Sequence, residues 1–154
     1  MIKRDIFKTF AALMAVGFLL AMPVAALAKS EVNQSSIGAV AIEGTDPVAY
    51  FSEQKAVKGS SEYNHRWKGA QWQFKNAANR DAFAAEPEKY APQFGGYCAW
   101  AVSQGYTAKT DPEAWTVHKG KLYLNYSKGV RDNWAKDIPG NITKAESNWP
   151  KVLN

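Results

Sequence analysis

The chain has 154 residues, 46% of them hydrophobic, and a formal charge of +5, which is typical of one globular domain. Its lysines are scattered singly or in pairs rather than gathered in a stripe, so we expect a solvated surface and no nucleic-acid partner. The single cysteine, Cys98, excludes an internal disulfide, so the fold must be stabilised by packing, for which six Trp, seven Tyr and seven Phe are available.

Residues 1–28 have the layout of a cleavable secretory signal. Basic residues precede an apolar run over residues 10–24, and the small side chains of Ala26 and Ala28 suit cleavage after Ala28. An uncleaved anchor is the alternative, but the run is shorter than the ~20 residues of a spanning helix, and Pro23 interrupts its end. We therefore predict a periplasmic or secreted protein with no stable membrane span after cleavage.

The remaining chain is predicted to form one domain. Residues 29–36 are polar and lack an apolar period, which indicates a flexible lead, and the domain itself is expected over residues 37–154. Near its start, Thr45 or Asp46 can cap a short helix that carries Tyr50, because either side chain can accept the free N–H groups of a first turn that tolerates Pro47.

A β-hairpin is predicted over residues 63–74. Strict alternation of side chains flanks a Lys-Gly turn, whose glycine can adopt a positive φ. Pairing across this turn sets His65 opposite Trp72 and Tyr63 opposite Phe74, all on one face.

A second hairpin is predicted over residues 115–124, around another Lys-Gly turn. Its pairing places Leu122 and Leu124 on the buried face. Tyr123 and His118 then share the opposite, wetter face.

Helical patterns occupy much of the rest of the chain. They comprise one helix capped by Asn76, a short buried helix at residues 97–102, and two helices at residues 127–134 and 142–149 with Pro139-Gly140 between them. Antiparallel hairpins interleaved with helices predict an α+β fold, in which a small antiparallel sheet built from the two hairpins packs against several short helices.

Five short motifs cover much of the expected domain. They are residues 46–51 (DPVAYF), 72–74 (WQF), 87–90 (PEKY), 95–101 (GGYCAWA) and 122–126 (LYLNY). In this order and spacing they resemble the YHS domain family, in its exported, stand-alone bacterial branch. The resemblance implies a small module related to metal-handling proteins. However, Ala49 and Lys75 stand where metal-associated members carry cysteines, so a thiolate pair for a soft cation is missing.

Cys98 and His65 are the candidate metal ligands. A thiolate is a strong ligand and nucleophile, although a free cysteine more often serves as a small buried hydrophobe. His65 lies on the apolar face of the first hairpin, where it is either ligating or a hydrogen-bonded core residue. The cofactor is undetermined; copper(I) is the first choice if a metal binds, because thiolate and imidazole suit soft ions and copper(I) tolerates two ligands. The further candidate ligand contacts are Asp46, Tyr50, Tyr97 and Trp100.

The sequence contains no standard catalytic signature. We therefore predict a non-catalytic envelope protein that binds a small ligand or a soft metal ion such as copper through an aromatic-lined pocket. A thiol-dependent enzyme or redox component that uses Cys98 is the first alternative. An accessory protein that docks another envelope protein is the second.

Overall fold

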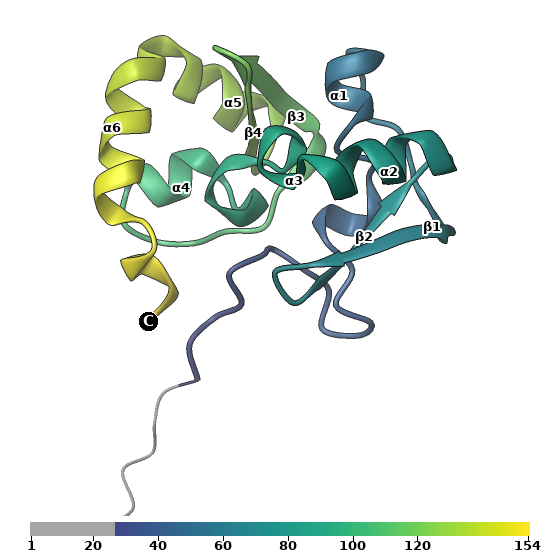
Figure 1. Cartoon of the computed structure of the whole chain (residues 1–154). Coiled ribbons are helices and arrows are strands. Elements are labelled where there is room, and N and C mark those ends of the chain that lie inside the picture. Colours follow the sequence, from purple (N-terminus) through teal and green to yellow (C-terminus); the bar gives the residue numbers. More distant parts are fainter. Residues whose placement is uncertain (1–26) are drawn as a thin grey trace, which may run out of the picture.

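A computed structural model describes residues 27–154 of the chain (Figure 1). The expected signal peptide therefore lies outside the described residues, except for its last two. Within residues 27–154, no helix has both the length and the apolar character needed to cross a membrane.

The described residues form an α+β fold, as predicted. The helices are α1 (Ala49–Ser52), α2 (Ala77–Ala85), α3 (Pro87–Tyr90), α4 (Ala99–Ser103), α5 (Lys128–Trp134) and α6 (Ile138–Asn148). The 3₁₀ turns in this part of the chain are η1 (Ile42–Gly44), η2 (Gln93–Gly96), η3 (Ala135–Asp137) and η4 (Lys151–Leu153). The strands are β1 (Ser60–Trp67), β2 (Ala70–Phe74), β3 (Asp111–His118) and β4 (Lys121–Asn125), and they form two separate two-stranded sheets rather than the one sheet expected.

Both Lys-Gly turns form as predicted. Lys68 and Gly69 have φ values of 49° and 74°, and the same values recur in the second turn, as a two-residue hairpin turn requires. His65 pairs with Trp72 as expected. The expected pairing of Tyr63 with Phe74 is wrong, because an irregularity in β1 shifts the register and sets Ser60 opposite Phe74.

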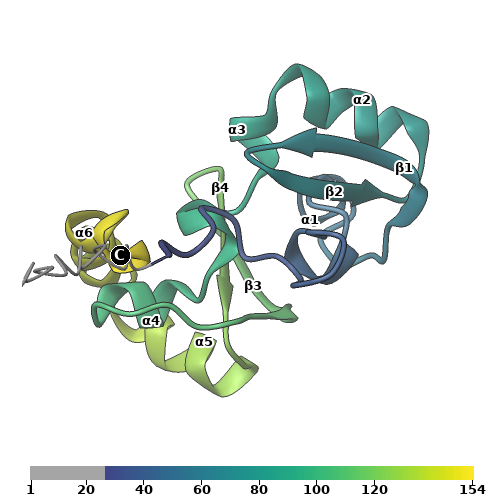
Figure 2. The same cartoon turned by 90° about the horizontal axis from the view of Figure 1, so that it is seen from below.

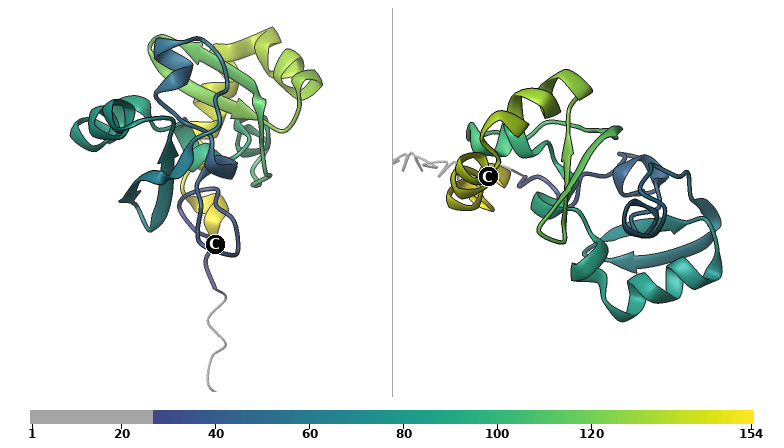
Figure 3. Two further views of the ribbon diagram at one scale, coloured as in Figure 1. Left: turned by 90° about the vertical axis from the view of Figure 1, so that its right-hand side faces the viewer. Right: turned by 90° about the horizontal axis from the view of Figure 1, so that it is seen from above.

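The hairpin of β3 and β4 lies between two groups of elements (Figures 2 and 3). On one side, Leu122 and Leu124 join a core that includes Trp72, Phe74 and Phe83, which we call the first core. On the other side, Tyr123 joins Phe94, Trp134 and residues of α4 and α6, which we call the second core. The expectation of a wet face at Tyr123 is therefore wrong: α4, α5 and α6 cover that face, and the side chain is 3% exposed.

The segment expected to be a flexible lead packs against the domain. Val32 is 1% exposed and belongs to the first core. The Asn33 backbone N–H donates to Gly95 O (2.8 Å), and its side-chain amide donates to Gly96 O (3.0 Å). This close approach requires glycine, because a Cβ on Gly95 would lie 1.8 Å from the carbonyl oxygen of Glu31.

The C-terminal helices differ from the expectation in where they divide. Pro139 and Gly140 lie in the first turn of α6 rather than between two helices. A first turn tolerates proline because its N–H groups have no partner within the helix. The Asp137 side chain caps this turn by accepting the Gly140 N–H at 3.0 Å.

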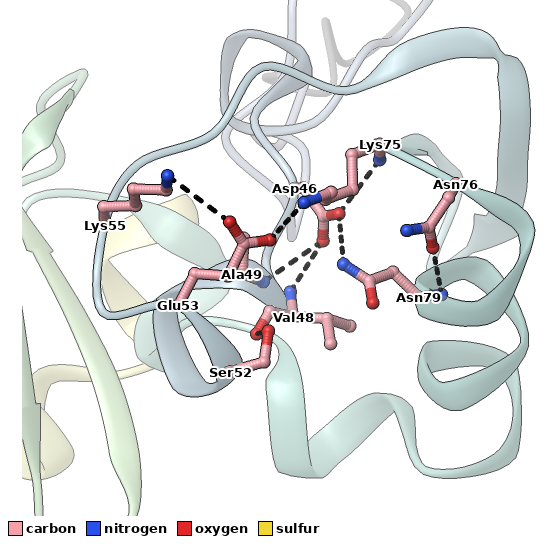
Figure 4. A network of polar contacts seen from close by, with 9 residues as sticks. All are labelled: Asp46, Val48, Ala49, Ser52, Glu53, Lys55, Lys75, Asn76 and Asn79. Carbon is pink, nitrogen blue, oxygen red and sulfur yellow. Dashed lines mark hydrogen bonds and ion pairs between the residues drawn. The ribbon is translucent and has the colours of Figure 1, made fainter.

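Asp46 joins three segments of the first core through its buried carboxylate (Figure 4). Oδ1 accepts the N–H groups of Val48 (2.9 Å) and Ala49 (3.4 Å) at the start of α1. Oδ2 accepts the backbone N–H of Lys75 (2.9 Å), directly after β2, and the side-chain amide of Asn79 (2.7 Å) in α2. The predicted capping role is confirmed, and the same carboxylate also holds β2 and α2.

We expect Asp46→Asn to lower the free energy of unfolding by about 3 kcal/mol. The substitution replaces one carboxylate oxygen by an NH₂ group, which cannot accept the hydrogen bonds that this oxygen accepts in a buried site. Urea denaturation measures the change. Asp81→Asn is the matched control: Asp81 is exposed, pairs only with neighbouring Arg80, and its substitution should leave the stability nearly unchanged. Equal effects of the two substitutions would contradict this assignment.

Candidate functional site

Cys98 is a buried structural residue. It directly precedes α4 and is 1% exposed. Its Sγ donates to Asn125 Oδ1 (3.6 Å) and accepts the backbone N–H of Tyr126 (3.3 Å). Burial raises the pKa of the thiol above its ordinary value, because desolvation penalises the thiolate. The thiol is therefore neutral and shielded, which does not favour a nucleophile or a readily formed metal ligand.

Asn125 completes this arrangement and was not singled out from the sequence. It is fully buried at the end of β4, and its Oδ1 also accepts the backbone N–H of Trp100 (3.1 Å) at the first turn of α4. Asn125 and Cys98 thus fasten the start of α4 to β4. Within residues 27–154, the Nδ2 atom of Asn125 has no hydrogen-bond partner.

His65 lies far from this arrangement. It is half-buried on β1, opposite Trp72, and its ring centroid lies 6.2 Å from that of Phe83 in the first core. Cys98 instead borders the second core, and Figures 1 and 2 show β1 and α4 on opposite sides of the molecule. The structure therefore does not form the expected pair. The described part of the chain also holds no group of three or more His, Cys, Asp or Glu side chains that could bind a metal ion.

The other predicted contacts do not converge on one cavity. The Tyr50 hydroxyl donates to the carbonyl oxygen of Pro112 (2.8 Å), and the Tyr97 hydroxyl donates to that of Ser30 (2.9 Å). Asp46 accepts four hydrogen bonds, as described above. Trp100 lies half-buried against the second core. Three of these four residues therefore use their polar atoms to hold the fold.

Tyr50 also carries a strongly perturbed hydroxyl. Its ring is buried and packs against Trp115 at a centroid distance of 5.4 Å. Burial raises its pKa well above the ordinary value of 10.0, and the negative charges of Glu113, Asp111 and Asp46 raise it further.

A pocket of about 440 Å³ lies elsewhere, where the two cores approach each other. Its walls come from the β1–β2 turn, the α3–η2 segment, the N-terminal segment and the end of α6. We call it the Trp pocket. Its aromatic lining is Trp67, Trp72, Phe94 and Trp149, and its charged lining is Glu31, Glu88, Glu146, Lys68 and Lys121. None of the six predicted site residues lines it.

The aromatic walls are held by their neighbours. Trp67 packs on Trp72 (5.9 Å between ring centroids) and edge-on to Phe83 (5.8 Å). Trp149 packs on Phe94 (6.0 Å) and Tyr97 (6.2 Å). The two tryptophans thus extend from different cores into one pocket, and their rings are already fixed there.

The Lys68 side chain covers part of the Trp67 ring. Its Nζ lies 4.9 Å from the Trp67 ring centroid and 2.6 Å from Glu31 Oε1. Both charged side chains are about half exposed, so this ion pair is weak and open to exchange with solvent or ligand.

We expect the Cys98 thiol to react slowly with a thiol reagent in the native protein, because the sulfur is shielded and its pKa is raised. Addition of urea should accelerate the reaction to the rate of a free cysteine. Absorbance of the released chromophore measures both rates on the same sample, and the denatured chain is its own control. Rapid labelling of the native protein would instead support the thiol-dependent enzyme.

We expect Tyr50 to make the protein lose stability at alkaline pH. Because its folded pKa is raised, its contribution is fully present below pH 10, its ordinary pKa, and is lost as pH rises toward the folded value. Over that window the free energy of unfolding should fall by up to about 1.4 kcal/mol per pH unit. Urea denaturation at several pH values should show a shallower fall for Tyr50→Phe. Tyr106→Phe, at an exposed ring, is the control, and identical slopes in all three proteins would contradict the assignment.

Comparison with protein-family models, curated proteins and solved structures found no match to this chain. Its resemblance to the YHS domain family stays a prediction.

Proposed function

We propose that this protein is a non-catalytic binding protein that takes a small organic ligand into the Trp pocket. The observation that carries the proposal is a pocket of about 440 Å³ with three tryptophans in its walls. Small-molecule sites have volumes of roughly 300–1,000 Å³ and combine an aromatic lining with a few polar groups. The Trp pocket has this size and an aromatic lining, and it carries more charged side chains than such a site usually does.

The fixed aromatic rings support binding. Trp67 and Trp149 each pack against two other aromatic rings, so they lose little conformational freedom when a ligand covers them. The Trp72 indole N–H donates to the Trp67 carbonyl oxygen (3.1 Å), which further ties the two residues together. A flat or compact apolar group is therefore the chemistry that this pocket suits.

The residues that line the Trp pocket favour ligand binding rather than thiol chemistry. Neither Cys98 nor His65 contributes to the Trp pocket, and the thiol is buried in another part of the described chain. A copper site that needs both residues is not part of the proposal, because His65 lies beside the first core and Cys98 beside the second. We place the binding protein in the cell envelope, periplasmic or secreted, on the pattern of residues 1–28.

A screen of small organic compounds by ligand-observed NMR tests the proposal. We expect hits whose affinity falls about tenfold in Trp67→Ala and in Trp149→Ala, because each substitution removes one aromatic wall. Trp100→Ala is the matched control: Trp100 is also half-buried but does not line the Trp pocket, so the hits should keep their affinity. Circular dichroism checks that the variants fold.

The proposal fails if the screen yields no hit. It also fails if the hits bind both pocket variants as tightly as they bind the wild type.

A further inference from the structure

We infer that the ligand of the Trp pocket is a small organic cation, an inference that rests on the proposed function. The pocket is lined by three carboxylates and two ammonium groups, although the chain as a whole carries a charge of +5. One of the two lysines, Lys68, is already paired with Glu31. The lining therefore carries one net negative charge, on a chain that is positive as a whole.

The pocket already holds one cation of its own. The Lys68 ammonium lies over the Trp67 ring and against the Glu31 carboxylate, at 4.9 Å and 2.6 Å. A cation within about 6 Å of an indole centroid is attracted by the negative face of the ring. Trp67 and Glu31 thus form a receptor for an ammonium group, and the half-exposed Lys68 can leave it at little cost.

The other two carboxylates are free to meet a ligand. Among residues 27–154, neither Glu88 nor Glu146 takes part in an ion pair. Glu146 lies three residues before Trp149, a spacing that places two side chains on one side of a helix end. The charge of Glu146 also affects Tyr123: burial raises the pKa of the Tyr123 hydroxyl, and the negative charge of Glu146 raises it further. The Trp pocket therefore holds these two carboxylates among the same lining residues as the indoles of Trp67 and Trp149.

A pocket that contains both indole rings and carboxylates should bind cations more tightly than neutral or anionic ligands. An anion would face the two unpaired carboxylates, Glu88 and Glu146, while Lys68 is engaged by Glu31 and Lys121 is exposed to solvent. A neutral ligand would gain from the indole faces but not from the carboxylates. A quaternary or protonated amine gains from both.

Three isosteric probes test the inference on the purified full chain. Choline carries the charge, 3,3-dimethylbutan-1-ol is its neutral isostere, and 3,3-dimethylbutanoate is an anion of similar shape. Titrations followed by the indole N–H signals give the affinities. We expect choline to bind about fivefold more tightly than the neutral alcohol, and the anion to bind most weakly. Added salt should weaken choline alone.

Three variants locate the effect. Glu88→Gln combined with Glu146→Gln should reduce the preference for choline toward unity, whereas Glu53→Gln, whose ion pairs lie outside the pocket, should leave it unchanged. Lys68→Gln should tighten choline binding about threefold, because it removes the internal competitor from the Trp67 face.

The inference and the proposed function fail separately. Equal affinities for choline and the alcohol, tighter binding of the anion, or weaker choline binding in Lys68→Gln would overturn the cation inference and leave a neutral or anionic ligand for the pocket. Binding by none of the three probes also overturns it. The proposed function depends on the compound screen instead: it falls if the screen yields no hit, or if the hits bind Trp67→Ala and Trp149→Ala as tightly as they bind the wild type.

Discussion

The fold depends on the burial of both faces of β4. Successive side chains of a strand point to opposite faces, so Leu122 and Leu124 complete the first core while Tyr123, between them, completes the second. The turn at Lys119-Gly120 sets which residues face which core. A slip of one residue would exchange the two sets, burying Tyr123 where two leucines fit. One short strand therefore determines the packing of both halves of the molecule.

The Trp pocket is a consequence of this division. The two cores share one strand, and the pocket lies between them. Partly buried aromatic residues that pack against each core form its walls, Trp67 on one side and Trp149 on the other. Lys121, the first residue of β4, also lines the pocket. A ligand bound there would contact both halves at once, so its affinity would depend on how the two cores sit about β4.

Polar residues that suggest chemistry are used here to fasten helices. Asp46 accepts four N–H groups and holds α1 to β2 and α2, while Asn125 and Cys98 hold α4 to β4. Asp46 Oδ1 and Asn125 Oδ1 each accept N–H groups that the start of a helix leaves free. Burial, rather than residue type, thus decides between a structural and a reactive role, since it keeps the thiol neutral and closes the carboxylate to solvent.

The sequence by itself determined the features that depend on neighbours within a few residues: the two Lys-Gly turns, the caps at Asp46 and Asn76, and hence the α+β class. It did not determine the irregular register of β1, the burial of Tyr123 or the separation of His65 from Cys98. Nor could it locate a pocket whose lining runs from Glu31 to Trp149. These were decided by the tertiary structure, because periodicity shows which side of a strand or helix is apolar but not which distant segment covers it.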